Sequence, residues 1–253
     1  MSRIDRAVGL ARSLLVYHAI PLRQRRMKRL YRQFAKRGDL VFDIGAHVGN
    51  RSRALASLGC RVVALEPQPL FARLLRTLFW RSSRVEVVEA AVASTAGEAW
   101  LSVSERTPTV STLASDWREA RAQEPGFGGV DWNRRLPVRT VTLDELVARF
   151  GAPSFVKIDV EGGEPAVLAG LTHAVPALSF EYLPSALDQV AACVDRLAAL
   201  AGSDSEYRFN WSVGETYALA SSEWVDGAGL VVALVSGGAS ARSGDVYARL
   251  MPR

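Results

Sequence analysis

The sequence predicts a doubly wound α/β fold: a mostly parallel sheet with an antiparallel last strand, preceded by an N-terminal helical extension. From residue 38 onward, short strand-like runs alternate with stretches of helical composition, which is the pattern of parallel strands joined by crossover helices. The strand candidates are almost continuously apolar, as expected when helices cover both faces of a sheet. A glycine loop directly follows the first of them. We therefore expect one domain over residues 38–253, with residues 1–37 as an extension.

Each expected element has a local signal in the sequence. Two βα units come first, and Pro67 and Pro69 end the second strand. The region after residue 207 predicts a strand, a helix that starts at Ser222 as its N-cap, and a final strand. Strands are expected at 40–44, 61–65, 85–89, 155–159, 177–182, 207–213 and 245–251, and helices at 51–58, 70–80, 164–171, 185–200 and 222–235.

Composition and cysteine content exclude several classes of protein. The chain has 253 residues and is 49% hydrophobic, which is enough for a large core. No apolar run approaches the roughly 20 residues that a membrane-spanning helix needs. The N-terminal apolar stretch is broken by Arg12 and leads into a basic run, so it does not resemble a signal peptide. Cys60 and Cys193 are too few for a disulfide framework. We expect a cytoplasmic protein with reduced thiols.

The positive charge is concentrated in residues 1–37. This segment contains eleven Lys and Arg residues against the single acid Asp5, whereas the whole chain has a net charge of +5. Apolar residues at helical spacing favour one or two helices here, with a break or kink at Pro21. A helical cap on the sheet is one interpretation. Peripheral contact with an anionic membrane is the other, and would suit a lipid-linked acceptor. The sequence shows no aromatic platform or RNA-binding module, which argues against nucleic acid as a partner.

Residues 104–136 contain no clear strand or helix pattern. They contain Pro108, Ser/Thr runs and the glycine-rich stretch at 125–129. Irregular insertions of this length in compact domains are uncommon unless they form a lid or a binding loop. We therefore expect a lid-like insertion over a ligand site, with disorder as the alternative.

The strongest functional signal is the stretch VFDIGAHVGN at residues 41–50. Here a strand ends in Asp43, and Gly45 and Gly49 lie in the loop that leads into a helix. The spacing D-x-G-x-x-x-G differs from the G-x-G-x-x-G that binds a dinucleotide pyrophosphate. It suits S-adenosylmethionine (SAM), because glycines let the loop approach the sulfonium and the amino-acid tail, and Asp43 can accept a hydrogen bond from the ammonium group.

A second acid supports the same ligand. Glu66 directly follows the second strand, where a carboxylate can accept hydrogen bonds from both ribose hydroxyls. The end of the third strand, Glu89 and Ala90, lies where an adenine edge is expected. The residues predicted to bind the cofactor are Asp43, Gly45, Ala46, His47, Gly49, Asn50, Glu66, Pro67, Glu89, Ala90 and Asp159.

Four segments resemble the FkbM family of SAM-dependent methyltransferases: VFDIGAHVGN, VVALEPQP at 62–69, VRTVTLDEL at 138–146 and FVKIDVEGGEPAVLAGL at 155–171. The resemblance covers about residues 40–182. It implies a class I methyltransferase (Rossmann-like) fold and O-methylation of a hydroxyl on a sugar, glycolipid or other secondary metabolite. The chain departs from the family at His47 and Val48 and in the length of the 104–136 insertion, which bears on substrate fit.

Three acids fall at the carboxyl ends of the strands, where ligands of open α/β sheets bind: Asp159, Glu161 and Glu181. With Lys157, they are the candidate catalytic residues. We expect Asp159 to orient or deprotonate the acceptor hydroxyl. Glu161 and Glu181 are the next candidates for this role. A lysine in a doubly covered strand needs a partner, which predicts an ion pair to one of these carboxylates. The alternative is a purely structural buried network. Whether these acids bind a divalent cation is left open by the sequence.

The sequence thus predicts a SAM-dependent methyltransferase that acts on a small-molecule, glycan or lipid-linked hydroxyl. Two alternatives remain: methylation of RNA or of a nitrogen, and an inactive SAM-binding protein with a docking or regulatory role. The acids at 159, 161 and 181 argue against the inactive protein, because a pure binder does not need carboxylates beside the methyl group.

Overall fold

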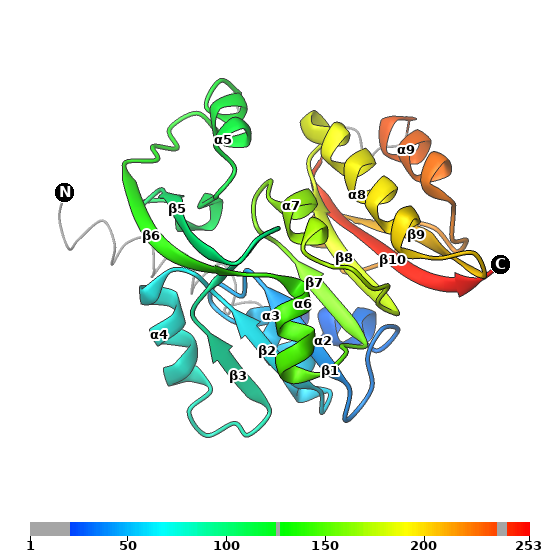
Figure 1. Ribbon diagram of the computed structural model, residues 1–253, viewed down its shortest axis with the longest axis horizontal. Helices are drawn as coiled ribbons and strands as arrows, with labels where there is room; N and C mark the ends of the chain where they lie inside the picture. Colours follow the sequence, from blue (N-terminus) through cyan, green and yellow to red (C-terminus); the bar gives the residue numbers. More distant parts are fainter. Residues whose placement is uncertain (1–20, 125–126, 237–241) are drawn as a thin grey trace.

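The computed structural model of the protein describes residues 21–124, 127–236 and 242–253. Its centre is a seven-stranded sheet in the order β3-β2-β1-β7-β8-β10-β9 (Figure 1). The strands are β1 (Leu40–Ile44), β2 (Arg61–Leu65), β3 (Val85–Val88), β7 (Phe155–Ile158), β8 (Ala177–Tyr182), β9 (Ser205–Val213) and β10 (Gly244–Pro252). Strand β10 runs antiparallel to both neighbours, and the pairs from β3 to β8 are parallel. The expected doubly wound sheet with an antiparallel last strand is confirmed.

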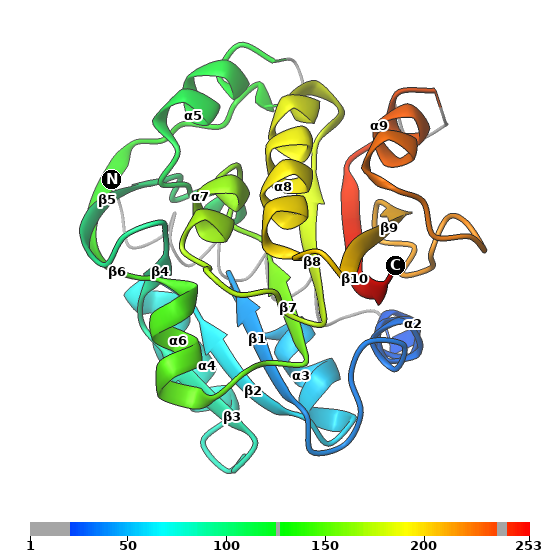
Figure 2. The same cartoon turned by 45° about the vertical axis from the view of Figure 1, so that its right-hand side comes forward.

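Helices cover both faces of this sheet. Helices α6 (Leu143–Phe150), α7 (Glu164–Ala169), α8 (Leu187–Leu200) and α9 (Gly227–Ser236) pack on one face. Helices α2 (Pro21–Tyr31), α3 (Asn50–Ser57) and α4 (Pro69–Leu78) pack on the other. In Figure 2, α6, α7 and α8 lie in front of the sheet and α3 lies behind it. Successive residues of β1 point to opposite faces, and both are buried: Val41 packs under α2 and α3, and Phe42 under α6.

The described part of the basic segment is a helical cap. Met27, Leu30 and Tyr31 of α2 are buried against the sheet, whereas Arg26 and Arg29 are exposed. This arrangement agrees with the cap interpretation for residues 21–37. Residues 1–20 lie outside the described residues, so the expected membrane contact of the segment stays a prediction there.

The expectation that residues 104–136 lack regular structure is wrong. Strands β4 (Ala91–Val92), β6 (Arg134–Val141) and β5 (Gly97–Val103) form a second sheet, and η1 (Pro108–Val110) and α5 (Ser115–Arg121) lie between β5 and β6. The pairing of β5 with β6 joins residues on either side of the insertion, and such long-range pairing leaves little local signal. The small sheet and α5 lie at the end of the main sheet toward which β1 points (Figure 2).

Contacts with the loop after β7 hold the insertion in place. The Trp117 side chain of α5 is 4% exposed and packs on Gly162 so closely that a Cβ there would lie 2.2 Å from the ring. The hydroxyl of Thr112 donates to the carbonyl of Glu161 at 2.7 Å. Arg121 pairs with Glu124 at 2.9 Å and donates to Ser185, which lies in η3 (Pro184–Ala186) before α8. The described residues of the insertion therefore pack against the main domain through these contacts.

Several expected boundaries shift. The strands expected at 85–89 and 155–159 end one residue earlier, at Val88 and Ile158. The helix expected from Ser222 begins at Gly227, because Val225 still pairs with Phe209 as an isolated bridge and the Asp226 carboxylate accepts the Gly229 N–H at 2.8 Å. Within the described ranges, no helix has both the length and the apolar character needed to cross a bilayer.

Replacing Trp117 with alanine is expected to free the insertion from the main domain. The loss removes a large buried side chain, but the affected contacts are local, so opening should precede global unfolding. Limited proteolysis within residues 104–124 should accelerate at least tenfold, while the main thermal transition is retained. Trp100→Ala is the matched control, since this tryptophan of β5 is 56% exposed. Equal cleavage rates in the two variants would contradict the packing described.

Candidate active site

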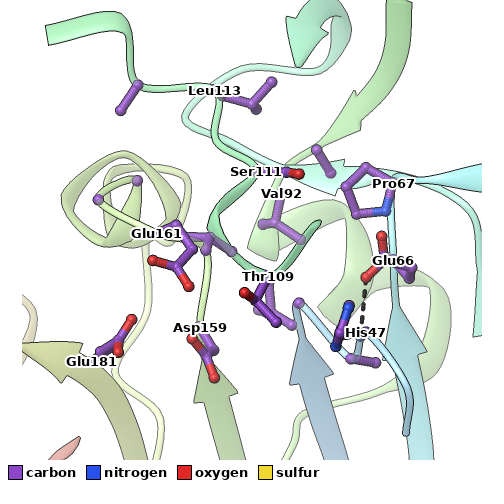
Figure 3. A pocket seen from close by; sticks show the side chains of 18 of the residues that line it. His47, Glu66, Pro67, Val92, Thr109, Ser111, Leu113, Asp159, Glu161 and Glu181 are labelled. Carbon is purple, nitrogen blue, oxygen red and sulfur yellow. Dashed lines mark hydrogen bonds between the residues drawn. The ribbon is translucent and has the colours of Figure 1, made fainter. Parts of the chain in front are cut away.

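A cavity of about 540 Å³ lies beyond the carboxyl ends of β1, β2 and β7, between the main sheet and the insertion. In the view of Figure 3, Ser111 and Leu113 of the insertion lie at the top of it, and Thr109 of the insertion lies between Asp159 and His47. The loops after β1, β2 and β7 also line it. This is the position where open α/β sheets bind ligands, and the volume suits a ligand of nucleoside size.

The two glycines of the loop after β1 have different structural roles. Gly45 lines the cavity with φ +78°, and a Cβ there would lie 1.8 Å from the carbonyl oxygen of Asp159. Glycine is thus required for the loops after β1 and β7 to meet. Gly49, with φ +75°, is the N-cap of α3, and a Cβ there would lie 2.6 Å from Leu75 of α4. Gly49 is not among the cavity-lining residues and serves helix packing.

Glu66 is fixed by the backbone around it. Its two carboxylate oxygens accept the N–H of His47 at 2.9 Å and the N–H of Gln68 at 2.8 Å. Burial raises the pKa of this carboxyl to about 7, although both hydrogen bonds oppose the shift. Glu66 and the neighbouring Pro67 line the cavity, and Figure 3 shows the hydrogen bond that joins Glu66 to the loop after β1. The two βα units are therefore locked together at this carboxylate.

His47 lies in the cavity wall in a left-handed backbone conformation, with φ +47°. Its ring packs on Phe71 of α4 with a centroid distance of 4.3 Å. Burial lowers the pKa of the imidazole to about 4, so the ring is neutral at pH 7. Ala46 and Asn50 also line the cavity. The predicted loop residues Gly45, Ala46, His47 and Asn50 thus share one wall.

Besides Gly49, two predicted cofactor residues lie outside the lining of the cavity. Asp43 is fully buried in β1 and accepts a hydrogen bond from Ser52 of α3. Burial raises the pKa of its carboxyl. Glu89 pairs with Arg76 of α4 at 2.8 Å on the surface, because β3 has already ended at Val88. Its neighbour Ala90 does line the cavity, as do the residues of β4.

A buried charge network underlies the cavity. Lys157 of β7 is fully buried, and its Nζ lies 3.2 Å from Asp159 and 3.2 Å from Asp245 of β10. Arg51 of α3 lies 3.4 Å from Asp159. The predicted ion pair of Lys157 with an acid is confirmed for Asp159. Lys157 itself is not among the cavity-lining residues; Asp159, Asp245 and Arg51 are.

Asp159, Glu161 and Glu181 come together, although β7 ends at Ile158 and does not continue through Glu161. Glu161 has φ +56°, and this turn brings its carboxylate toward the two other acids. Ligand atoms of all three lie within 4.8 Å of one another, and Figure 3 shows the three side chains gathered at one end of the cavity. Three carboxylates this close resist full ionisation.

The three carboxyls have different electrostatic surroundings. Burial alone would raise the pKa of Asp159, but Lys157 and Arg51 outweigh it and lower the value. Burial, followed by the neighbouring acids, raises the pKa values of Glu161 and Glu181 well above the usual range. Neither glutamate carboxylate makes a hydrogen bond or ion pair with any residue that the structure describes. Asp159 is therefore an ionised, paired group, and the two glutamates are the groups that can exchange a proton.

Sequence reasoning missed several residues of the site. Arg51 directly follows the recognised glycine loop, and the excess of acids at the strand ends could have pointed to a cation there. Asp245 is the second residue of β10 and lies opposite Glu181, a pairing that only the long-range antiparallel register creates. Thr109, Ser111 and Leu113 come from the insertion, for which only a covering role was expected.

The topology and the position of the cavity define a class I methyltransferase fold. A model of the methyltransferase FkbM domain matches residues 43–209. The chain belongs to this family of SAM-dependent methyltransferases, as its sequence motifs indicate.

The chain is also similar to a named methyltransferase and to solved structures. The chain is 27% identical to hexuronic acid methyltransferase AglP of Haloferax volcanii over 155 residues, which are 60% of this chain and 58% of that protein. Among solved structures, the O-methyltransferase from Bacillus cereus in complex with SAH is 14% identical, with a TM-score of 0.46 and coverage of 98% of this chain and 89% of that one. TomG from Streptomyces achromogenes in complex with SAM is 11% identical, with a TM-score of 0.44 and coverage of 99% and 91%.

The charge network yields a stability prediction. Lys157→Met leaves the Asp245 carboxylate buried without its cation and should lower the free energy of unfolding by about 3–5 kcal/mol. Adding Asp245→Asn should recover part of that loss, because the uncompensated charge is then gone. Chemical denaturation measures both effects, with the exposed Arg53→Met of α3 as a control that should change stability by less than about 0.5 kcal/mol. A double variant no more stable than the single one would contradict the pairing.

Proposed function

We propose that this protein transfers the methyl group of SAM to a hydroxyl oxygen of a sugar-containing acceptor, either a small glycan or a lipid-linked one. The observation that carries the proposal is the placement of Glu66 and the acid group Asp159, Glu161 and Glu181 in the same cavity. Glu66 suits the ribose end of a nucleoside, and the acids suit an acceptor that must lose a proton.

The cavity fits the cofactor on the evidence of its own residues. Glu66 uses one lone pair of each oxygen for backbone N–H groups, which leaves acceptor capacity for two ribose hydroxyls. The small side chains Ala90 and Ala91 leave space beside it for an adenine ring. The bound cofactor supplies a methyl group on a positively charged sulfur. The sequence predicted that Asp43 accepts a hydrogen bond from the ammonium group. Because Asp43 is fully buried beneath the loop, it would influence the cofactor only through the loop.

The acid group favours a hydroxyl over a carboxylate as the methyl acceptor. A hydroxyl must lose its proton during transfer, and a carboxylate oxygen would meet three acids at close range. Because Asp159 is held by Lys157 and Arg51, we propose that it orients the acceptor and that Glu161 or Glu181 receives the proton. This differs from the expectation that Asp159 is the first choice for the base. The printed name of the hexuronic acid relative supports a sugar as the acceptor.

The same three acids remain the candidate ligands for a divalent cation. Their carboxylate oxygens lie within 4.8 Å of one another, a spacing that one hard cation can bridge. Such an ion would lower the pKa of a bound hydroxyl, so it is a second route to the same proton loss. Peripheral contact with an anionic membrane also remains a prediction, for the basic segment 1–37.

Cofactor binding tests the first part of the proposal. S-adenosylhomocysteine (SAH) should bind with an affinity that falls about tenfold between pH 8 and pH 6, because Glu66 has a pKa of about 7 and its ionised form accepts the ribose hydroxyls. Calorimetry on Glu66→Gln should show weak binding without this pH dependence. Glu86→Gln serves as the control, since that exposed glutamate pairs with Arg149. Wild-type protein that binds no SAH would refute the proposed function.

Methyl transfer tests the second part. Incubation with isotopically labelled SAM and host glycan or envelope-lipid fractions should label a sugar hydroxyl. Glu161→Gln and Glu181→Gln should retain SAH binding, and at least one should lower turnover by about a hundredfold or more. Turnover that survives exhaustive EDTA treatment supports the glutamate base, and turnover restored only by Mg²⁺ or Mn²⁺ supports the cation. SAH binding without any labelled product would support the inactive alternative.

A further inference from the structure

The turn after β7 carries Asp159 and Glu161 on a backbone that its surroundings must hold. Glu161 has φ +56°, a left-handed conformation that is costly for a residue other than glycine and persists only where neighbouring contacts fix it. The Asp159 N–H donates to the carbonyl of Ile44 in β1 at 3.0 Å, and the Thr112 hydroxyl donates to the carbonyl of Glu161 at 2.7 Å. These two bonds lie on either side of the peptide N–H of Val160.

Glu164 holds the peptide between these two bonds. This glutamate is the first residue of α7, and one of its carboxylate oxygens accepts the N–H of Val160 at 3.1 Å. Glu164 is only 3% exposed. Burial raises the pKa of its carboxyl to about 7, and both the ionised and the neutral carboxyl keep an oxygen that can accept this N–H. The start of α7 is therefore tied to the turn that carries the acids.

Glu164 lies behind the acid group and not in the wall of the large cavity. It is absent from the described residues that line that cavity. Together with Glu181 and Cys193 it lines a second cavity, of about 10 Å³. A space of this size holds about one water molecule, so it is too small for a substrate. Glu164 can therefore influence a ligand in the large cavity only through the residues that it holds.

We propose that Glu164 is a positioning residue for methyl transfer. By accepting the Val160 N–H, it keeps the next residue, Glu161, turned toward the other two acids. The inference rests on the proposed function, in which Glu161 or Glu181 receives the proton of the acceptor hydroxyl. Proton transfer requires hydrogen-bond distance between the two oxygens, so a small displacement of the accepting carboxylate lowers the rate strongly. Loss of Glu164 should therefore slow turnover, and cofactor binding by the loops after β1 and β2 should remain.

A split between rate and binding tests this role. Turnover is measured with labelled SAM and the glycan or envelope-lipid fraction that the wild type labels. Glu164→Leu removes the acceptor oxygen and should lower the maximal rate about tenfold or more over a dilution series of that fraction, with the half-saturating amount and the Kd for SAH changed by less than about threefold. Glu164→Gln keeps an oxygen that can accept the N–H, so its maximal rate should stay within about threefold of the wild type.

Glu145 offers a matched control at the start of α6. Its carboxylate accepts the N–H of Thr142 at 3.1 Å, the same kind of bond, but Glu145 is exposed and does not line the cavity. Glu145→Leu should change the maximal rate by less than about twofold. Thermal melts without ligand show which variants are folded. If Glu164→Leu is not folded, Glu164→Met replaces it, since methionine is closer to glutamate in length and also lacks a carboxylate oxygen.

Hydrogen exchange at the Val160 amide tests the hydrogen bond without any acceptor. By NMR, this amide should exchange about tenfold faster or more in Glu164→Leu than in the wild type, and Glu164→Gln should retain its protection. Equal exchange in all three proteins would overturn the inference, as would a Gln variant as slow in turnover as the Leu variant. A wild type that labels no product refutes the proposed function and the inference with it. A Leu variant as fast as an active wild type refutes the inference alone.

Discussion

The buried cation of Lys157 is the interaction on which the arrangement of the site depends. This side chain lies in the middle of the sheet with no access to water, and it is offset by Asp159 from its own strand end and Asp245 from the antiparallel strand beside β8. A buried charge is tolerated only with such partners. The two contacts join β7 to β10 across β8, so the acids at three strand ends are fixed relative to one another before any ligand enters.

The same network gives the three neighbouring acids different pKa values. Asp159 is tied to Lys157 and Arg51, which keep it ionised. Glu161 and Glu181 lie beside it, and no cation in the described part of the chain forms an ion pair with them. Burial and the neighbouring acids raise their pKa values, so they hold protons more strongly than exposed glutamates do. One site thus contains an ionised carboxylate and two carboxyls with raised pKa values. Neighbouring acids have acquired different properties from their electrostatic surroundings alone.

The main sheet was predictable from the sequence because its signal is local. Strands β1, β2 and β8 have the expected bounds, since continuous apolar runs ended by glycine, proline or acid specify a doubly covered strand without knowledge of its partners. The small sheet was not predictable in this way. Strand β6 is half exposed and rich in arginine, and it becomes a strand through its pairing with β5 at the other end of the insertion. That information is not present in either segment alone.

The site residues divide in the same way: those with a local signal were predicted, and those placed by long-range strand pairing were not. The loop after β1 and Glu66 were found because their spacing belongs to consecutive βα units, which lie side by side in the sheet. Asp245 escaped notice because its place beside Lys157 follows from an antiparallel strand that starts far along the chain. Glu89 was misplaced relative to the cavity by a single residue: β3 ends at Val88, and the next side chain turns to Arg76 on the surface. At a strand end, one residue separates a cavity wall from a surface ion pair, and local propensity does not resolve that difference.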